Sequence, residues 1–174
     1  MNPFVDAFVA IRDFCESGGD VLYAILAVTV LMWTFIIERI WYFYFVLPQR
    51  VSAVKTVWDE RADTTSWSAQ QIRAALISEV SLESRRFLLL IKTLMAVLPL
   101  LGLLGTVTGM IAVFDVMAFA GTGNPRLMAA GVSKATIPTM SGLVAALSGL
   151  YFAAWLEKKA RMEGDRLEGL LVRH

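Results

Sequence analysis

Three stretches of this chain are apolar enough and long enough to cross a lipid bilayer as helices. Residues 21–37, 94–114 and 135–156 carry no charged side chain. A helix needs roughly 20 apolar residues to span the hydrocarbon core of a bilayer. With 57% hydrophobic residues among 174, the chain has more apolar surface than one soluble domain of this size can bury. We therefore predict an all-α polytopic membrane protein with three transmembrane helices.

The distribution of basic residues predicts the orientation of these helices. Eight of the 16 Lys and Arg residues lie from Arg39 to Lys92, and five follow Leu156. Because segments rich in Lys and Arg stay in the cytoplasm, the N-terminus is expected on the outer side and the C-terminus in the cytoplasm. The chain opens with acidic rather than basic residues, so we expect no cleavable signal and a retained first span.

Turn signals and helical spacing predict the segments of a single domain. These are an interfacial helix on the outer surface at 1–17, spans at 20–47, 91–118 and 128–157, a cytoplasmic helical hairpin at 48–90, an outer loop at 119–127 and a cytoplasmic tail at 158–174. Within the hairpin, Ser68 and Gln71 are expected to form a capping box. Apolar residues at helical spacing predict that the tail extends the third span, namely Leu156, Ala160, Leu167 and Leu171.

The composition argues against an enzyme, a metal site or a nucleic-acid partner. Cys15 is the one cysteine and His174 the one histidine, so no Cys/His metal site and no nucleophile with a base and an orienting group can be assembled. The net charge of +1 gives no reason to expect nucleic-acid binding. No cofactor is predicted, and membrane lipids are the partner that the apolar runs imply.

Small residues recur along one face of each of the last two spans when the helices are projected at 100° per residue. We call these the small faces. They comprise Met95, Pro99, Gly102, Thr106, Gly109 and Val113 in the second span and Ala135, Thr139, Gly142, Ala146, Gly149 and Ala153 in the third. Two interpretations stay open, because small residues allow close helix packing in lipid and threonine hydroxyls can also line a polar path.

The amino-acid sequences of these two segments resemble those of a known family. LGLLGTVTGM at Leu101–Met110 and GVSKATIPTMSGLVAAL at Gly131–Leu147 are similar to the paired hallmark segments of the MotA/TolQ/ExbB proton-channel family. The three-span layout agrees with the ExbB and TolQ branch, since MotA proteins have an additional span and a longer cytoplasmic domain. The chain most resembles the short form of ExbB in a TonB system.

The resemblance implies a multi-pass protein of the bacterial inner membrane, with its N-terminus in the periplasm. In this family a homopentamer surrounds two helices of an ExbD-type partner in a central pore, and proton flow drives a TonB-type protein that opens outer-membrane receptors, for example in iron uptake. An aspartate on the partner carries the proton. By position in the motifs, the residues expected along the proton path are Thr106 and Thr139, with Gly102, Gly109, Gly142 and Ala146 lining the pore.

One position departs from the family pattern. Many relatives have an acidic residue five positions before the third-span threonine, and this chain has Lys134 there. We expect Asp115 and Lys134 to form an ion pair near the outer rim, within or between subunits, because an unpaired charge at that depth is costly. The alternative is that each side chain extends separately to the membrane surface.

Other functions are compatible with the same residues. A TolQ-like motor that maintains the outer membrane would share the motifs, and a non-conducting membrane scaffold would share the small faces. A small transporter is disfavoured because the spans contain no central charge.

Overall fold

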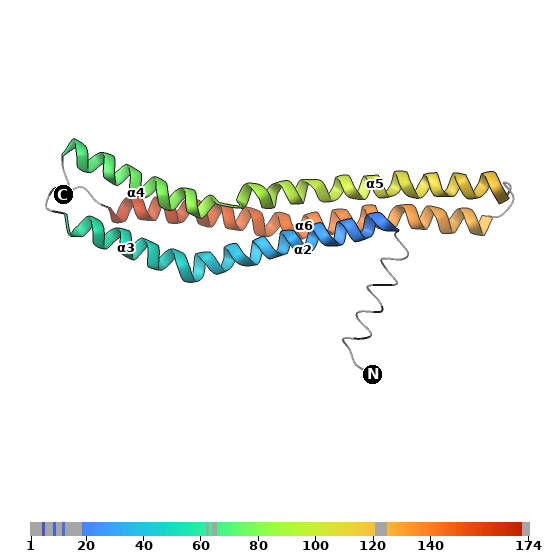
Figure 1. The fold of residues 1–174 in the computed structure, drawn as a ribbon, viewed down its shortest axis with the longest axis horizontal. Helices are drawn as coiled ribbons and strands as arrows, with labels where there is room; N and C mark the ends of the chain where they lie inside the picture. The colour runs from blue at the N-terminus through green and yellow to red at the C-terminus, as the bar shows by residue number, and fades with distance from the viewer. Residues whose placement is uncertain are drawn as a thin grey trace. The chain divides into compact units, whose positions relative to one another are not determined.

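The computed structural model describes residues 5, 9, 12, 19–61, 63, 66–120 and 125–171, and the regular elements there are helices (Figure 1). In chain order they are α2 (Asp20–Trp41), the π-helix η1 (Tyr42–Val46), α3 (Leu47–Asp59), α4 (Trp67–Arg85), α5 (Leu88–Ala120) and α6 (Pro125–Leu170). Most of the predicted interfacial helix at 1–17 and part of the predicted loop at 119–127 lie outside the described residues.

Three helical segments are long and apolar enough to cross a membrane. They are Asp20–Asp59, Trp67–Phe119 and Met128–Leu170, and each contains one of the predicted spans. The all-α fold with three membrane-crossing helices is therefore confirmed. The sides of the membrane on which the termini lie stay a prediction from the basic residues.

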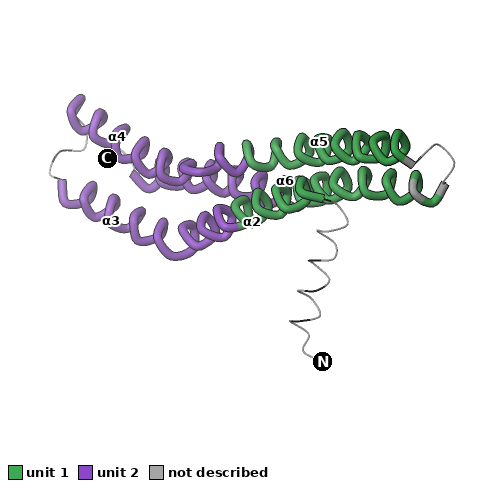
Figure 2. The backbone as a smooth tube through the Cα atoms, turned by 45° about the vertical axis from the view of Figure 1, so that its right-hand side comes forward, with its two compact units in different colours: residues 1–33, 93–150 green, residues 34–92, 151–174 purple. Residues whose placement is uncertain are grey.

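The chain divides into two compact units (Figure 2). Unit 1 comprises residues 1–33 and 93–150, and unit 2 comprises residues 34–92 and 151–174. Helices α2, α5 and α6 each contribute to both units.

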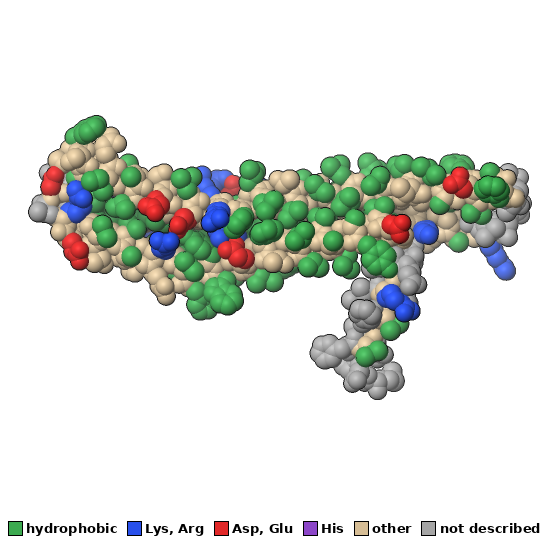
Figure 3. All heavy atoms as spheres, in the orientation of Figure 1, with side chains coloured by type: hydrophobic (Ala, Val, Ile, Leu, Met, Phe, Trp, Pro, Cys, Tyr) green, Lys and Arg blue, Asp and Glu red, His purple; other side chains and the backbone are tan. Residues whose placement is uncertain are grey.

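Unit 1 is a bundle of α2, α5 and α6 with little interior and much exposed apolar surface. Its buried side chains include Met32 of α2 and Leu98 of α5, whereas Leu100 and Val144 are each about two-thirds exposed. Hydrophobic side chains accordingly cover much of the face of α5 and α6 seen in Figure 3. Exposed apolar surface of this extent belongs against lipid or against other membrane-embedded helices.

Unit 2 buries the apolar side of the tail as its spacing predicts. Leu156, Ala160, Leu167 and Leu171 are all buried, and α6 runs without interruption to Leu170. Arg73 of α4 donates hydrogen bonds to the carbonyl oxygens of Glu168 and Leu171, each at 2.6 Å. Basic side chains that bind the last carbonyl groups of a helix stabilise its end.

The predicted capping box at Ser68 and Gln71 is wrong. Helix α4 begins at Trp67, and its cap is Ser66, whose hydroxyl accepts a hydrogen bond from the Ala69 N–H at 3.1 Å. The Asp63 carboxylate in turn accepts from the Ser66 N–H at 3.0 Å. The turn before the helix therefore fixes the cap two residues earlier than the sequence pattern indicates.

A break separates α4 from α5 at Phe87, whose backbone has a φ of 63°. This left-handed conformation is rare for a bulky residue. The Phe87 ring stacks on Phe35 with ring centroids 5.3 Å apart. The Arg39 guanidinium lies 5.2 Å from the Phe87 ring centroid and 4.5 Å from that of Tyr42.

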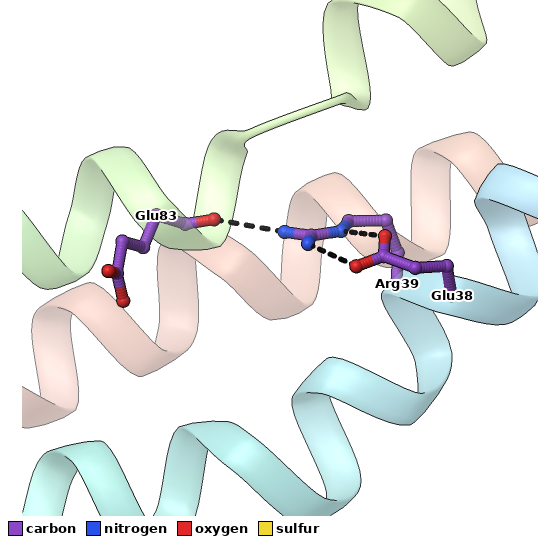
Figure 4. Close-up of polar contacts among 3 residues, drawn as sticks. All are labelled: Glu38, Arg39 and Glu83. Carbon is purple, nitrogen blue, oxygen red and sulfur yellow. Dashed lines mark hydrogen bonds and ion pairs between the residues drawn. The ribbon is translucent and has the colours of Figure 1, made fainter.

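Arg39 is almost fully buried, and its guanidinium also binds polar groups of Glu38 and Glu83 (Figure 4). Its Nε and Nη2 atoms donate to the Glu38 carboxylate at 2.6 Å, and its Nη1 donates to the Glu83 carbonyl oxygen at 3.0 Å. The Glu83 carboxylate points away from Arg39 and accepts from the Tyr42 hydroxyl at 3.1 Å. The Arg86 N–H also donates to the Glu83 carbonyl oxygen, at 3.2 Å, so Arg39 gives this carbonyl group at the end of α4 a second donor.

Candidate functional site

The small faces meet in unit 1, where α5 packs closely against α6. A Cβ atom on Gly109 would lie 2.6 Å from the Cα of Ala135, and one on Gly142 would lie 2.5 Å from the Leu98 carbonyl oxygen. These contacts are to backbone atoms, which cannot move aside as a flexible side chain can. The two helices can therefore approach this closely only because both positions are glycine.

Thr139 forms a hydrogen bond across this contact. Its hydroxyl donates to the Gly102 carbonyl oxygen at 2.8 Å. In an α-helix this carbonyl also accepts the N–H of the residue four positions later, which is Thr106. The two threonines singled out by the sequence are thus linked to the same peptide group of α5.

Thr106 lies at the edge of the packed surface rather than inside it. The buried line on α5 runs through Leu98, Gly102, Gly105, Gly109 and Val113. At 100° per residue, Thr106 is about 60° around the helix from the centre of this line. Its side chain is half-buried, and its hydroxyl donates to the Leu103 carbonyl oxygen of its own helix at 2.6 Å.

Sequence reasoning missed two members of this packed surface, Gly105 and Pro138. Both are buried, and a Cβ on Gly105 would overlap the Pro138 ring. The spacing of Gly102, Gly105 and Gly109 by three and four residues was the available signal, since it places all three on one helix face. We call this packed surface the α5–α6 seam. It comprises Leu98, Gly102, Gly105, Gly109 and Val113 of α5 and Ala135, Pro138 and Gly142 of α6, with Thr106 and Thr139 at its edge.

The predicted pore-lining residues fall into two groups, one buried and one half-buried. Gly102, Gly109 and Gly142 are buried in the α5–α6 seam of a single chain, so close packing accounts for them there. Thr106, Thr139 and Ala146 are half-buried and keep exposed surface. A role of any of these residues in lining a pore stays a prediction.

Asp115 and Lys134 carry the charges of the predicted rim ion pair. Both side chains are exposed, and within the described part of the chain no ion pair joins them. The Lys134 Cε instead lies 3.4 Å from the position of a Cβ on Gly19, at the start of α2. The predicted ion pair, within or between subunits, therefore stays a prediction.

The α5–α6 seam offers hydrogen-bonding groups but no proton carrier. Threonine hydroxyls donate and accept hydrogen bonds and do not ionise, and the other seam side chains are apolar. A proton that moved along this surface would need a titratable group from outside these two faces.

Sequence comparisons identify a family and relatives of this chain. The family model described as the MotA/TolQ/ExbB proton channel family matches residues 49–169. An ExbB-like biopolymer transport protein of Synechocystis sp., ExbB-like 3, is 39% identical over 88 residues, which cover 48% of this chain and 42% of that relative. A second, ExbB-like 1 from the same organism, is 28% identical over 166 residues, or 77% of this chain and 65% of the relative.

The matched regions make up less than two thirds of either relative's own length. The family model, in contrast, covers more than half of this chain and includes α4 and both segments of the α5–α6 seam. The chain belongs to the MotA/TolQ/ExbB proton channel family.

Proposed function

We propose that the chain is the proton-channel and stator subunit of an inner-membrane motor that uses the proton motive force to energise TonB-dependent import through the outer membrane. Membership of a proton channel family and the ExbB-like relatives support this assignment. The observation on which it chiefly rests is the pair of threonine hydroxyls at the α5–α6 seam.

The hydrogen bonds of these hydroxyls suggest how they act. Thr106 and Thr139 each donate their proton to a backbone carbonyl, so their oxygen lone pairs are left to accept. An acceptor of this kind favours the protonated, neutral form of a nearby carboxyl group. The seam would therefore hold a partner carboxyl in its proton-loaded state while it passes through the low-dielectric region.

The carboxyl group must come from another protein. Residues 94–114 and 135–156 contain no charged side chain. We propose that ExbD-type helices supply it from a central pore and that five copies of this chain surround them. Exposed apolar residues such as Leu100, Met140 and Val144 give the copies and the surrounding lipid a surface to contact. The basic residues from Arg39 to Lys92 support an N-terminus in the periplasm.

The proposal is tested by TonB-dependent iron uptake in cells that co-express the chain with its ExbD-type partner. Thr106→Ala and Thr139→Ala are expected to abolish most uptake at an unchanged yield of the complex. Thr108→Ala and Thr136→Ala are matched controls, since both hydroxyls are on the same helices, are exposed and bond only to their own helix. Uptake at the wild-type level in both test variants would contradict the proposal.

A non-conducting scaffold is the second candidate, and the Thr139–Gly102 hydrogen bond favours it because the bond also serves packing. In a scaffold, Thr139→Ala would lower the yield of the complex and leave uptake per complex unchanged. If the role is TolQ-like, deletion of the chain would leave iron uptake unaffected and would make the outer membrane permeable to detergents.

A further inference from the structure

A pocket in unit 2 collects basic side chains from three helical segments. Its walls come from one residue at the end of α4, three at the start of α5 and three of α6, namely Arg85, Leu88, Leu89, Lys92, Glu157, Ala160 and Arg161. The cavity has a volume of about 490 Å³ and opens to the surface. It does not include any residue of the α5–α6 seam, and the proposed motor function does not use it.

The charges in this pocket do not balance. The Glu157 carboxylate accepts from the Lys92 Nζ on one oxygen and from the Arg161 Nη2 on the other, both at 2.8 Å. It therefore holds two cations at fixed positions in the wall. Arg85 is exposed, and no acidic side chain among the described residues pairs with it. Three cations thus face one carboxylate, which suits an anionic ligand.

The position of the pocket along the helices indicates its depth in the membrane. Lys92 lies just before the uncharged run of residues 94–114, and Glu157 directly follows the uncharged run of residues 135–156. Both helices leave the hydrocarbon core at this point, so the pocket is level with the lipid headgroups. Leu89, also in the wall, is 78% exposed and provides an apolar surface beside the cations.

The start of α5 adds to the positive potential. The helix begins at Leu88, in the pocket wall. The N-terminal end of a helix carries a partial positive charge from the aligned peptide dipoles. Arginine and lysine side chains, a helix start and an adjacent apolar surface together match a phosphate group attached to an acyl chain.

We propose that this pocket binds the phosphate headgroup of an anionic phospholipid, with Arg85, Lys92 and Arg161 contacting the phosphate and Leu89 contacting the acyl chain. A soluble phosphate compound shares the headgroup's chemistry, but it would gain nothing from the apolar wall or from the depth of the site. The inference requires that α5 and α6 span a membrane, and it does not require proton conduction.

The test measures how strongly the full-length chain retains phosphatidylglycerol over phosphatidylcholine. The protein is placed in nanodiscs of an equal mixture of the two lipids, extracted with mild detergent and analysed by native mass spectrometry. The wild type is expected to retain phosphatidylglycerol preferentially, and each of Arg85→Gln and Arg161→Gln is expected to lower the retention ratio roughly fivefold. Because Arg85 has no ion pair to lose, R85Q keeps the test valid if R161Q fails to fold.

Lys158→Gln is the matched control, because Lys158 follows Glu157 directly, is exposed and does not line the pocket. It should leave the ratio unchanged. Equal retention of both lipids by the wild type, unchanged retention in R85Q, or an equal loss in K158Q would overturn the proposal.

Titration of inorganic phosphate onto the protein in pure phosphatidylcholine nanodiscs tests whether the bound phosphate belongs to a lipid or to a soluble compound. No saturable binding is expected, and saturable binding that R85Q abolishes would assign the site to a soluble phosphate instead.

Discussion

Gly109 shows how the absence of one Cβ atom sets the spacing of two helices. The nearest obstacles to a side chain at this position are backbone and Cβ atoms of Ala135 on the facing helix. A larger residue would have to push α5 away from α6, and the Thr139–Gly102 hydrogen bond one to two turns along would lengthen with it. The glycines of the seam therefore also determine where the proposed functional hydroxyls lie.

Gly109→Ala is expected to destabilise the protein by about 1–3 kcal/mol, the usual cost of overpacking a tight contact. Gly164→Ala is the control, because Gly164 lies in α6 with no atom within 4 Å of an added Cβ. Alanine there should stabilise the helix by up to about 1 kcal/mol. Denaturation of the purified protein in detergent, followed by circular dichroism, measures both. Equal stability of G109A and the wild type would mean that the seam opens at little cost.

The break between helices α4 and α5 depends on a residue from α2. Arg39 contacts the Glu83 carbonyl oxygen and the Phe87 ring at once, and Glu38 neutralises its charge. The planar guanidinium can stack on a ring and donate in several directions of one plane, which a lysine ammonium cannot do. The conformation of Phe87 is therefore maintained by contacts from another helix rather than by its own preference.

Arg39→Lys is expected to cost about 1–3 kcal/mol, because the buried guanidinium is replaced by an ammonium that cannot keep the hydrogen bonds to the Glu83 carbonyl and the Glu38 carboxylate together. Amide groups near Phe87 should exchange hydrogen faster, as measured by mass spectrometry of peptides covering residues 80–92. Arg50→Lys is the control, since Arg50 is exposed and lies 3.5 Å from the Glu83 carboxylate. Unchanged exchange in R39K, or an equal increase in R50K, would contradict this role.

The sequence predicted some of these elements better than others. The uncharged runs predicted α5 and α6, because about 20 consecutive apolar residues cross a bilayer as a helix, which satisfies every backbone group within the segment. The helical spacing of four apolar residues predicted that the tail continues α6, namely Leu156, Ala160, Leu167 and Leu171. The left-handed conformation of Phe87 has no local signature, whereas the choice of Ser66 over Ser68 as the cap had one nearby. The first depends on Arg39 and Phe35, and the second on a turn fixed by Asp63.

At the scale of the whole molecule, the sequence predicted three membrane-crossing helices and the family, but it placed the small faces only approximately. The projection included Thr106 and omitted Gly105, whereas the buried line of α5 passes through Gly105 and leaves Thr106 at its edge. Periodicity identifies which residues share a face, and it cannot say where on that face another helix will pack. The pocket at Arg85 was missed because its residues come from distant parts of the chain.

We expect the chain to conduct protons only together with a partner that brings a carboxyl group to the threonine hydroxyls. The most direct measurement is proton flux into liposomes that contain either the chain alone or its complex with the ExbD-type partner, driven by a potassium diffusion potential and followed with an internal pH dye. The complex should conduct, the chain alone should not, and the Thr106→Ala/Thr139→Ala complex should lose most of the flux. Flux through the chain alone equal to that of the complex, or full flux through the double variant, would contradict the account.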